Sequence, residues 1–573
     1  MSDLIALEGK VPLSPRNLPP VLTEIITPLK VEAWRKALST HPDRRFCQYI
    51  TDGLEKGFRI GFNYNSQSIR SAKSNMRSAT QHPQVVSDYI TRECMERRML
   101  ELQQQDQVDG LQISRFGVIP KKNQPGKWRL ITDLSSPNGA SVNDGIDPAL
   151  CSLAYASIDD AAAHILTLGK GTLLAKLDIK SAYRTVPVHP DDRPLLAVSW
   201  QGKVYIDTAL PFGLRSAPKI FNSIADALEW IIAQAVADPV LHYLDDFLFF
   251  GAPKTDNCYR ALRVAKGTCT TLGAPLAEEK SEGPSVVLPF LGIEVDTEAL
   301  ELRLPAEKLL RLKTLLASWQ GKKVCTKREL LSLIGHLQHA CKVIKPGRTF
   351  LRRMIDLSTS AKELHHHIRL NLGFRSDLCW WATFLQRWNG VGMLATLGHQ
   401  TPQVTVLSDA SGRWGCAAFC GSDWFQLPWQ GRWEEVHITI KELLPIVVAG
   451  AIWGSRWSGL RIQCLCDNAA VVAILNSGSS KHPLAMHLMR SLFFISAHFK
   501  FTLVASHIPG RHNQAADALS RDNQECFFSL VPQANVHPTP IPPGLLGLLL
   551  LHTPDWTSES WRRCSVLLFE RSS

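Results

Sequence analysis

The stretch VLHYLDDFLFF, residues 240–250, places two adjacent aspartates between two apolar runs. Short apolar runs on both sides of a polar pair are typical of a β-hairpin, and Asp245 and Asp246 would then lie at its tip. Adjacent carboxylates repel each other, and enclosing them between strands costs several kcal/mol unless a cation neutralises them. The stretch therefore predicts a hairpin whose tip binds a divalent metal ion.

A third carboxylate follows another apolar run. Residues 173–177 read LLAKL, and Asp178 ends this predicted strand. Mg²⁺ takes oxygen ligands and keeps coordination positions open for substrate phosphates. Two such ions a few ångströms apart can stabilise both the attacking and the leaving oxygen of an in-line phosphoryl transfer. Asp178, Asp245 and Asp246 are therefore candidate ligands of such a site.

Two further segments fit a site that binds a nucleotide. Residues 116–134 predict a hairpin with a basic Pro-Gly turn whose cations can neutralise a triphosphate, although the segment alone is also typical of a surface hairpin. Residues 210–222 contain a Pro-Phe-Gly turn before a helix that Ser216 can cap and Pro218 can open.

In this order, the segments resemble the fingers and palm of a reverse transcriptase, and Tyr243–Asp246 matches the family's Tyr-x-Asp-Asp box. The resemblance implies that Asp178, Asp245 and Asp246 are catalytic and bind two Mg²⁺ ions, or Mn²⁺ in their place. Further roles are implied for Ile179 (a carbonyl metal ligand), Lys122 and Arg129 (the dNTP triphosphate), Tyr183 (a steric gate against a 2′-hydroxyl), Phe212 and Gly213 (the nucleotide pocket), Lys280 (near the leaving pyrophosphate) and residues 290–293 (the primer-grip hairpin).

A second set of four acids lies between residues 402 and 521. Asp409 ends an apolar strand, Glu442 opens an apolar helix, Asp467 follows a strand, and Asp517 lies in a short helix. Each also has a simpler explanation. Thr439 with Glu442 can form a capping box, Asp467 can cap the next helix, and the helix dipole favours an acid at Asp517.

Together, the four acids resemble the site of the ribonuclease H fold. That resemblance implies that Asp409, Glu442, Asp467 and Asp517 bind two Mg²⁺ ions and activate water to cleave the RNA of an RNA–DNA hybrid. The loop before Asp517 is shorter than the retroviral loop that carries a catalytic histidine, and whether His512 takes that role is left open.

The positive charge of the chain is concentrated. The formal net charge is +11, and residues 303–353 alone hold 13 Lys and Arg against two acids. Such a stretch can be a solvated helical face, but next to a polymerase it favours a track for the phosphate backbone. We then expect affinity for the hybrid to fall about tenfold or more between low and physiological salt. Trp380, Trp381 and Trp388, which follow, are interpreted as core residues.

Composition limits the class of protein. The chain has 573 residues, 45% of them hydrophobic and 20% charged, which excludes a disordered chain or a small disulfide scaffold. Its 14 cysteines include no C-x-x-C pair, so neither a zinc site nor a disulfide framework is predicted. No signal peptide is expected at residues 1–4, and residues 545–551 are too short to span a membrane. We expect an intracellular protein, in cytoplasm or nucleus, without membrane contact.

We therefore predict a multidomain α/β and α+β protein, a right-hand polymerase followed by a ribonuclease H-like α/β domain. The predicted parts are an N-terminal extension (1–105), fingers and palm (106–300), a basic helical thumb (301–360), a connection (361–401), the ribonuclease H-like domain (402–525) and a Pro-rich tail (526–573). The predicted function is RNA-directed DNA synthesis with degradation of the RNA strand. The partners would be an RNA template, a DNA primer, their hybrid and dNTPs.

The most specific prediction concerns the kind of retroelement that this sequence resembles. Residues 52–62, residues 329–353 and the Trp-rich helix resemble DIRS-type retrotransposons, which carry a tyrosine recombinase. The amino-acid sequence of residues 210–221 is more similar to that of gypsy-type elements, so a fragment of a gypsy-type polyprotein is an alternative. A domesticated copy that binds RNA or hybrid without catalysis is disfavoured, because all seven acids are present. Template specificity, priming and oligomeric state are left open.

Overall fold

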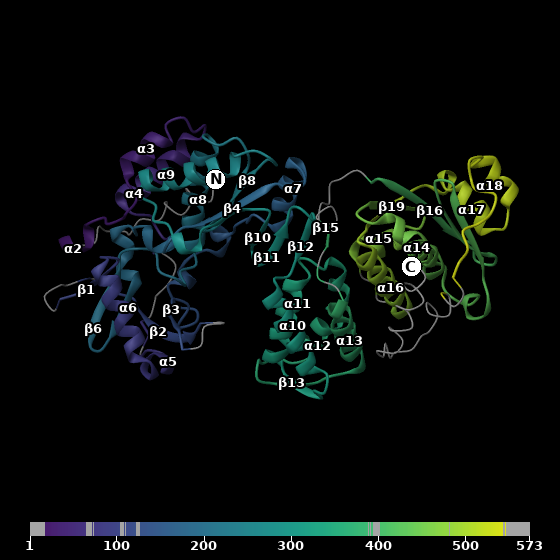
Figure 1. Ribbon diagram of the computed structural model, residues 1–573. Coiled ribbons are helices and arrows are strands. Elements are labelled where there is room, and N and C mark those ends of the chain that lie inside the picture. The colour runs from purple at the N-terminus through teal and green to yellow at the C-terminus, as the bar shows by residue number, and fades with distance from the viewer. Residues whose placement is uncertain are drawn as a thin grey trace. The chain divides into compact units, whose positions relative to one another are not determined.

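The computed structural model describes residues 18–64, 71–72, 74–103, 108, 110–121, 126–387, 389, 391–392, 402–478, 480, 482–542 and 545. The chain divides into two compact units, Met1–Ser157 with Gly171–Val286, and Ile158–Lys170 with Val287–Ser573. Helices and sheets occur in both units (Figure 1). The predicted multidomain mixture of α/β and α+β structure is confirmed.

The first unit contains two sheets, with strand orders β1-β6-β5-β2-β3 and β7-β8-β4-β9. In the second sheet every pairing is antiparallel. The strands are β1 (Met99–Glu101), β2 (Ile113–Pro120), β3 (Trp128–Asp133), β4 (Leu173–Asp178), β5 (Ala197–Trp200), β6 (Lys203–Asp207), β7 (Val240–Tyr243), β8 (Asp246–Gly251) and β9 (Glu282–Ser285).

Helices pack on these sheets. Ile220, Ile224 and Leu228 follow one another at four-residue spacing along α8, and they share a buried core with Phe247 and Phe249 of β8. The predicted helix after the Pro-Phe-Gly turn is thus confirmed, but Ser216, at its N-cap position, makes no side-chain capping hydrogen bond. The helices are α2 (Pro20–Thr23), α3 (Val31–Ala37), α4 (Arg44–Lys56), α5 (Arg77–Gln81), α6 (Pro83–Met95), α8 (Ala217–Ala233) and α9 (Asn257–Leu272).

The N-terminal helices belong to the same core. Trp34 of α3 is fully buried, and its indole Nε1 donates a hydrogen bond to the carbonyl of Leu272 at the end of α9, at 3.0 Å. Ile50 and Leu54 of α4 are buried in that cluster too. Residues 18–64 therefore help to support the sheet that carries Asp178 and Asp246.

A buried charge network joins α6, β6 and the segment after β4. Arg184 is 3% exposed, and its guanidinium lies 2.9 Å from Glu93 and 2.6 Å from Asp207, which are each 2% exposed. Arg98 donates a second hydrogen bond to Glu93 at 2.8 Å. Burial raises the pKa of Glu93, but the hydrogen bonds from Arg98 and the charge of Arg184 outweigh it and leave that pKa lowered.

Replacing Arg184 with Met is expected to lower the free energy of unfolding by about 3–5 kcal/mol, because Glu93 and Asp207 would remain buried with less compensation. Urea denaturation of the full-length protein measures this change. Arg97→Met is the matched control, since Arg97 pairs with Glu24 at the surface, with both side chains about half exposed; it should change stability by less than about 1 kcal/mol. Equal stability of the two variants would contradict the role given to the network.

The second unit begins with a small sheet and a group of helices. The sheet has the order β10-β11-β12-β15, and a separate pair joins β13 and β14. Trp380 and Trp381 of α13 are buried, as predicted, whereas Trp388 lies outside the described residues. The elements are α7 (Ile158–Leu168), β10 (Val287–Phe290), β11 (Ile293–Asp296), β12 (Glu301–Arg303), α10 (Ala306–Trp319), β13 (Val324–Thr326), α11 (Lys327–Ala340), α12 (Arg352–Thr359), β14 (His367–Arg369), α13 (Leu372–Arg387) and β15 (Val391–Gly392).

The rest of the second unit is built on a five-stranded sheet of order β18-β17-β16-β19-β20. β19 runs parallel to both β16 and β20, whereas β17 and β18 are antiparallel. The elements are β16 (Val404–Ala410), β17 (Gly415–Cys420), β18 (Asp423–Pro428), α14 (Ile438–Trp453), β19 (Arg461–Cys466), α15 (Ala469–Ser477), α16 (Pro483–Phe499), β20 (Thr502–His507), α17 (Gln514–Ser520) and α18 (Gln524–Leu530).

Helix α14 is the most apolar element of this sheet domain. Among the described residues, the helical segment Ile438–Trp457 is the single one whose length and hydropathy would allow it to cross a membrane, and 72% of it is buried within the protein. Leu443, Leu444, Val447 and Val448 belong to the same core as strands β16 and β19. Burial within this core explains why most of the helix is apolar.

Candidate active sites

The first acid cluster is positioned by the pairing of three strands. β7 and β8 form a hairpin in which Tyr243 is opposite Asp246, so Leu244 and Asp245 form the two-residue turn. β4 pairs with β8 so that Asp178 is opposite Asp246. The backbone N–H of Ile179 also donates to the carbonyl of Asp245 at 3.0 Å. The predicted hairpin is confirmed, and its register brings the three aspartates together.

The turn itself is strained. Leu244 has a φ of 54°, in the left-handed region that side chains other than those of glycine and asparagine rarely occupy. A two-residue hairpin needs positive φ in its turn, and a non-glycine residue there costs about 1–2 kcal/mol. The surrounding pairing of β4, β7 and β8 holds this conformation and thereby fixes the position of Asp245.

The three carboxylates repel one another. Burial, then the charges of Asp245 and Asp178, raise the pKa of Asp246 to about 6. Burial and the charge of Asp178 likewise raise the pKa of Asp245. The ammonium of Lys280 donates to both oxygens of Asp178, at 2.9 Å each. A cluster that already attracts a cation, and that offers oxygen atoms alone, has the donor set that Mg²⁺ or Mn²⁺ prefers.

Aromatic rings border this cluster. The ring of Tyr183 lies 5.4 Å from that of Phe212 and 5.6 Å from that of Phe221. Burial, with the nearby Tyr155 and Asp245, raises the pKa of Tyr183 to about 12, so its hydroxyl stays protonated at neutral pH. Phe212 is 53% exposed, which leaves its ring open to a ligand.

Gly213 is required by a close backbone approach. Its φ is +95°, and a Cβ there would lie 2.7 Å from the carbonyl oxygen of Thr132. The amide of Asn143 donates to the Gly213 carbonyl at 2.9 Å and accepts from the backbone N–H of Arg215 at 2.8 Å. Asn143 therefore fixes the Pro-Phe-Gly turn.

The other residues predicted to contact the nucleotide or the metal ions do not all lie in the acid cluster. Lys280 lies within the acid cluster, and Ile179 directly follows Asp178 in the backbone. Arg129 is exposed on β3 opposite Ile119, and thus belongs to the hairpin and not to the cluster. Lys122 lies outside the described residues. The hairpin at residues 290–293 is present, with Phe290 of β10 opposite Ile293 of β11.

Neither Tyr155 nor Asn143 was predicted as a site residue from the sequence. The ring centroid of Tyr155 lies 5.0 Å from that of Tyr243 in the aspartate hairpin. Tyr155 is in an irregular segment, far from Tyr243 along the chain, so no periodic pattern could have indicated the contact.

The second cluster brings together two acids from the five-stranded sheet and two from helices. Asp409 lies near the end of β16, and Asp467 directly follows the parallel strand β19. Glu442 is in α14 and Asp517 is in α17. The amide of Asn513 donates to the Ser408 carbonyl at 3.0 Å, which holds the start of α17 against β16.

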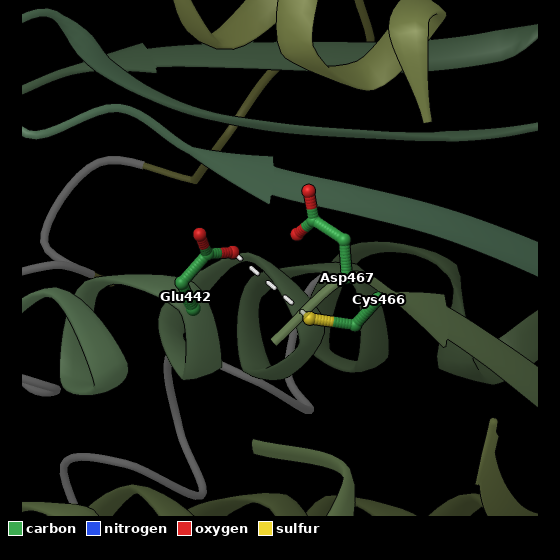
Figure 2. Close-up of side chains that lie close together, drawn as sticks. All are labelled: Glu442, Cys466 and Asp467. Carbon is green, nitrogen blue, oxygen red and sulfur yellow. Dashed lines mark hydrogen bonds between the residues drawn. The ribbon is translucent and has the colours of Figure 1, made fainter. Parts of the chain in front are cut away.

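The four acids interact electrostatically. Burial, then the charges of Asp409 and Asp467, raise the pKa of Glu442 to about 9. Burial raises the pKa of Asp409 to about 6, although the hydroxyl of Ser520 donates to this carboxylate at 2.5 Å. Glu442 and Asp467 lie close together beside Cys466 (Figure 2). The arrangement can bind hard divalent cations, because they would remove the repulsion.

Two of the simpler explanations for these acids are wrong. The helix α14 is capped by His437, whose ring accepts from the N–H of Thr439, so Thr439 and Glu442 form no capping box. Asn468, not Asp467, caps α15 by accepting from Ala470 and Val471. Asp517 does lie in the first turn of α17, as expected.

A histidine that was not predicted as a site residue lies beside Asp467. The ring Nε2 of His507, at the end of β20, lies 3.1 Å from the carbonyl oxygen of Asp467. His512 ends the short 3₁₀ helix Gly510–His512 just before α17. The pairing of β19 with β20 places His507 opposite Cys466, a contact that the linear motif could not indicate.

The basic stretch is used partly within the protein. Arg303 forms ion pairs with Glu294 and Asp296, at 3.0 and 2.6 Å. Further bases with intramolecular partners are Lys308 (Gly292 carbonyl), Lys322 (Glu329), Lys327 (Ala361 carbonyl) and Arg353 (Asp377). Exposed side chains include Lys323, Arg328, Lys342 and Arg348. The surface expected to follow a phosphate backbone is therefore smaller than residues 303–353 indicated.

Comparison with known proteins defines the class. Residues 119–295 match the family described as reverse transcriptase (RNA-dependent DNA polymerase). The chain therefore contains a reverse transcriptase domain, and this domain spans both acid-bearing strands of the first cluster.

The relatives are polyproteins of mobile elements and viruses. The Pol polyprotein from transposon opus of Drosophila melanogaster is 25% identical over 46% of this chain and 26% of its own length. The enzymatic polyprotein of Cestrum yellow leaf curling virus is 30% identical over 26% of this chain and 23% of its length. The match thus spans about a quarter of each relative.

Among solved structures, a foamy viral protease-reverse transcriptase in complex with an RNA/DNA hybrid aligns with a TM-score of 0.48. It is 13% identical, and the alignment covers 87% of this chain and 64% of that chain.

Proposed function

We propose that this protein is an RNA-directed DNA polymerase that also degrades the RNA strand of its product hybrid. The observation that carries the polymerase assignment is the register of β4, β7 and β8, which brings Asp178, Asp245 and Asp246 together inside the reverse transcriptase domain. The partners are an RNA template, a DNA primer, the hybrid and dNTPs.

The first cluster would catalyse nucleotide addition. Asp178, Asp245, Asp246 and the Ile179 carbonyl would hold two Mg²⁺, or Mn²⁺, whose charge lowers the cost of forming the attacking 3′-oxygen and the leaving pyrophosphate. Lys122 and Arg129 bind the triphosphate. Lys280 supplies positive charge beside Asp178, where the pyrophosphate leaves. Phe212 and Gly213 line the nucleotide pocket.

The second cluster would cleave RNA. Asp409, Glu442, Asp467 and Asp517 would hold a second pair of Mg²⁺ ions that activate water. Ser520 orients Asp409 through its 2.5 Å hydrogen bond, and Asn513 anchors the helix that carries Asp517. The mutual repulsion of four acids, two at strand ends and two on helices, supports this assignment.

The assignment to a retroelement subfamily is proposed from local sequence similarity alone. Residues 52–62 and 329–353 resemble DIRS-type elements, with a gypsy-type enzyme as the alternative. The full open reading frame of the source element decides between them, because a DIRS element encodes a tyrosine recombinase and a gypsy-type element an integrase.

Extension of a 5′-labelled DNA primer on an RNA template, with Mg²⁺ and dNTPs, tests the polymerase assignment. We expect full-length product that disappears when EDTA is added. A folded protein that binds the hybrid but extends no primer would contradict the assignment and favour a non-catalytic binding protein.

Tyr183 is expected to exclude ribonucleotides. Replacing it with Val removes the ring that lies against Phe212, and incorporation of rNTPs relative to dNTPs should rise at least about tenfold, the effect of roughly 1.4 kcal/mol of lost discrimination. Single-turnover extension with each nucleotide measures the ratio. Tyr183→Phe keeps the ring and should leave the ratio within about threefold. An unchanged ratio in Tyr183→Val would exclude this role.

A further inference from the structure

A buried cysteine lies among the acids of the second cluster. Cys466 is the last residue of β19, directly before Asp467, and is 0% exposed. Its Sγ lies 4.0 Å from Oε2 of Glu442, and the backbone N–H of Asn468 donates to the same sulfur at 3.4 Å. Figure 2 shows the Cys466 sulfur next to the Glu442 carboxylate, with the Asp467 side chain close by.

The spacing suits a metal ion that accepts sulfur. One ligand atom from each of Glu442, Cys466 and Asp467 lies within 4.8 Å of the others. In a tetrahedral zinc site a cysteine sulfur and a carboxylate oxygen lie about 3.6 Å apart, close to the 4.0 Å between Cys466 Sγ and Glu442 Oε2. In the part of the chain that the structure describes, no other cysteine belongs to such a group.

Sulfur changes which cation this part of the cluster prefers. Mg²⁺ binds oxygen ligands and gains little from a thiolate, whereas Zn²⁺, Cd²⁺ and Co²⁺ accept both. A site with one sulfur and two carboxylate oxygens keeps a fourth position for water, which is the pattern of an open zinc site. Glu442 and Asp467 would be shared between the two kinds of ion, so both cannot be bound fully at once.

We propose that Glu442, Cys466 and Asp467 form a binding site for a thiophilic divalent cation such as Zn²⁺, which inhibits hybrid cleavage by occupying two carboxylates that Mg²⁺ needs. The thiol proton of Cys466 and the carboxyl proton of Glu442 are both released to solvent when the metal binds. The inhibitory part rests on the proposed nuclease function, whereas the binding part does not.

Titration of the full-length protein with Co²⁺ tests the binding part. Thiolate ligation gives a sulfur-to-cobalt charge-transfer absorption in the near ultraviolet, and added Zn²⁺ should abolish it. We expect this band in the wild type and in Cys464→Ser, and its loss in Cys466→Ser. Cys464 is the matched control because it is buried on the same strand, two residues earlier. A band of equal strength in Cys466→Ser would overturn the proposal.

A second variant keeps the test valid if Cys466→Ser does not fold. Glu442→Gln retains the thiol but removes a charged oxygen ligand, and we expect its affinity for Co²⁺ to fall at least tenfold. Unchanged affinity would overturn the proposal.

Inhibition is measured as hybrid cleavage in excess Mg²⁺ with increasing Zn²⁺. Half-inhibition of Cys466→Ser should need at least tenfold more Zn²⁺ than that of the wild type, and equal sensitivity would overturn the inhibitory part. If the wild type shows the cobalt band but cleaves no hybrid, the proposed nuclease function fails while the metal site stands.

Discussion

Replacing Asp246 with Asn is expected to lower the rate of primer extension on an RNA template by on the order of 10³-fold, the loss typical of removing one preorganised electrostatic group from a transition state. Asp246 shares the cluster with Asp178, its partner in the β4–β8 register, and with Asp245 in the adjacent turn. The amide keeps the volume of the side chain but removes its charge, so the cluster would hold divalent cations less tightly. Single-turnover extension measures the effect.

The metal-free stability of Asp246→Asn should not fall as its polymerase activity does. The folded-state pKa of Asp246 is raised to about 6, from an ordinary 3.8. In metal-free protein its contribution to stability is therefore present below about pH 4 and is lost as the pH rises through 6. At pH 7 and without metal, Asp246→Asn should melt no lower than the wild type.

The matched control for this prediction is Glu282→Gln. Glu282 lies in β9 of the same sheet; its side chain is 47% exposed and pairs with the mostly buried Lys176 at 2.9 Å. This variant should extend primers within about threefold of the wild type. An Asp246→Asn protein that keeps more than a tenth of the wild-type rate would show that this carboxylate is not catalytic.

Local patterns predicted the pieces of the first site better than their assembly. Apolar runs on both sides of Asp245 and Asp246 indicated the hairpin, since the side chains of strands β7 and β8 pack into the core. The pairing of Asp178 with Asp246 is set by packing between distant segments, and it followed from the family resemblance and not from periodicity. Asn143 and Tyr155 act from irregular segments, where no period exists to be read.

The second site shows a similar limit. The order of strands and helices indicated the four acids of the cluster. It did not indicate which residues cap α14 and α15, because tertiary packing decides at which residue each helix begins. His437 and Asn468 cap α14 and α15, and Glu442 and Asp467 are thus available to the cluster. His507 was missed because its approach to Asp467 depends on the parallel pairing of β19 and β20.

The basic stretch shows why charge counts overestimate a binding surface. Net charge measures an excess, but it does not say which bases already have partners. Arg303 and Arg353 point at buried or half-buried acids, and Lys308 and Lys327 donate to backbone carbonyls. Side chains of this kind stabilise the fold, and only the exposed remainder is free to meet phosphate.

Replacing Glu442 with Gln is expected to lower the rate of hybrid cleavage by on the order of 10³-fold and to leave primer extension within about threefold. Glu442 is 6% exposed and lies among three other acids. Its carboxyl group therefore ionises at neutral pH only when a cation compensates the charge. The two activities are measured on one labelled hybrid, with RNA and DNA products separated.

The metal-free stability of the same variant gives an independent readout. The folded-state pKa of Glu442 is about 9, against an ordinary 4.5, so its contribution to stability is complete below about pH 4.5 and is lost as the pH rises toward 9. In EDTA, Glu442→Gln should therefore melt several degrees above the wild type at pH 8 and close to it at pH 5. Mg²⁺ should narrow the difference at pH 8. Glu435→Gln, an exposed position before α14, should shift neither cleavage nor melting. Equal melting of Glu442→Gln and wild type at both pH values would contradict the repulsion that defines this cluster.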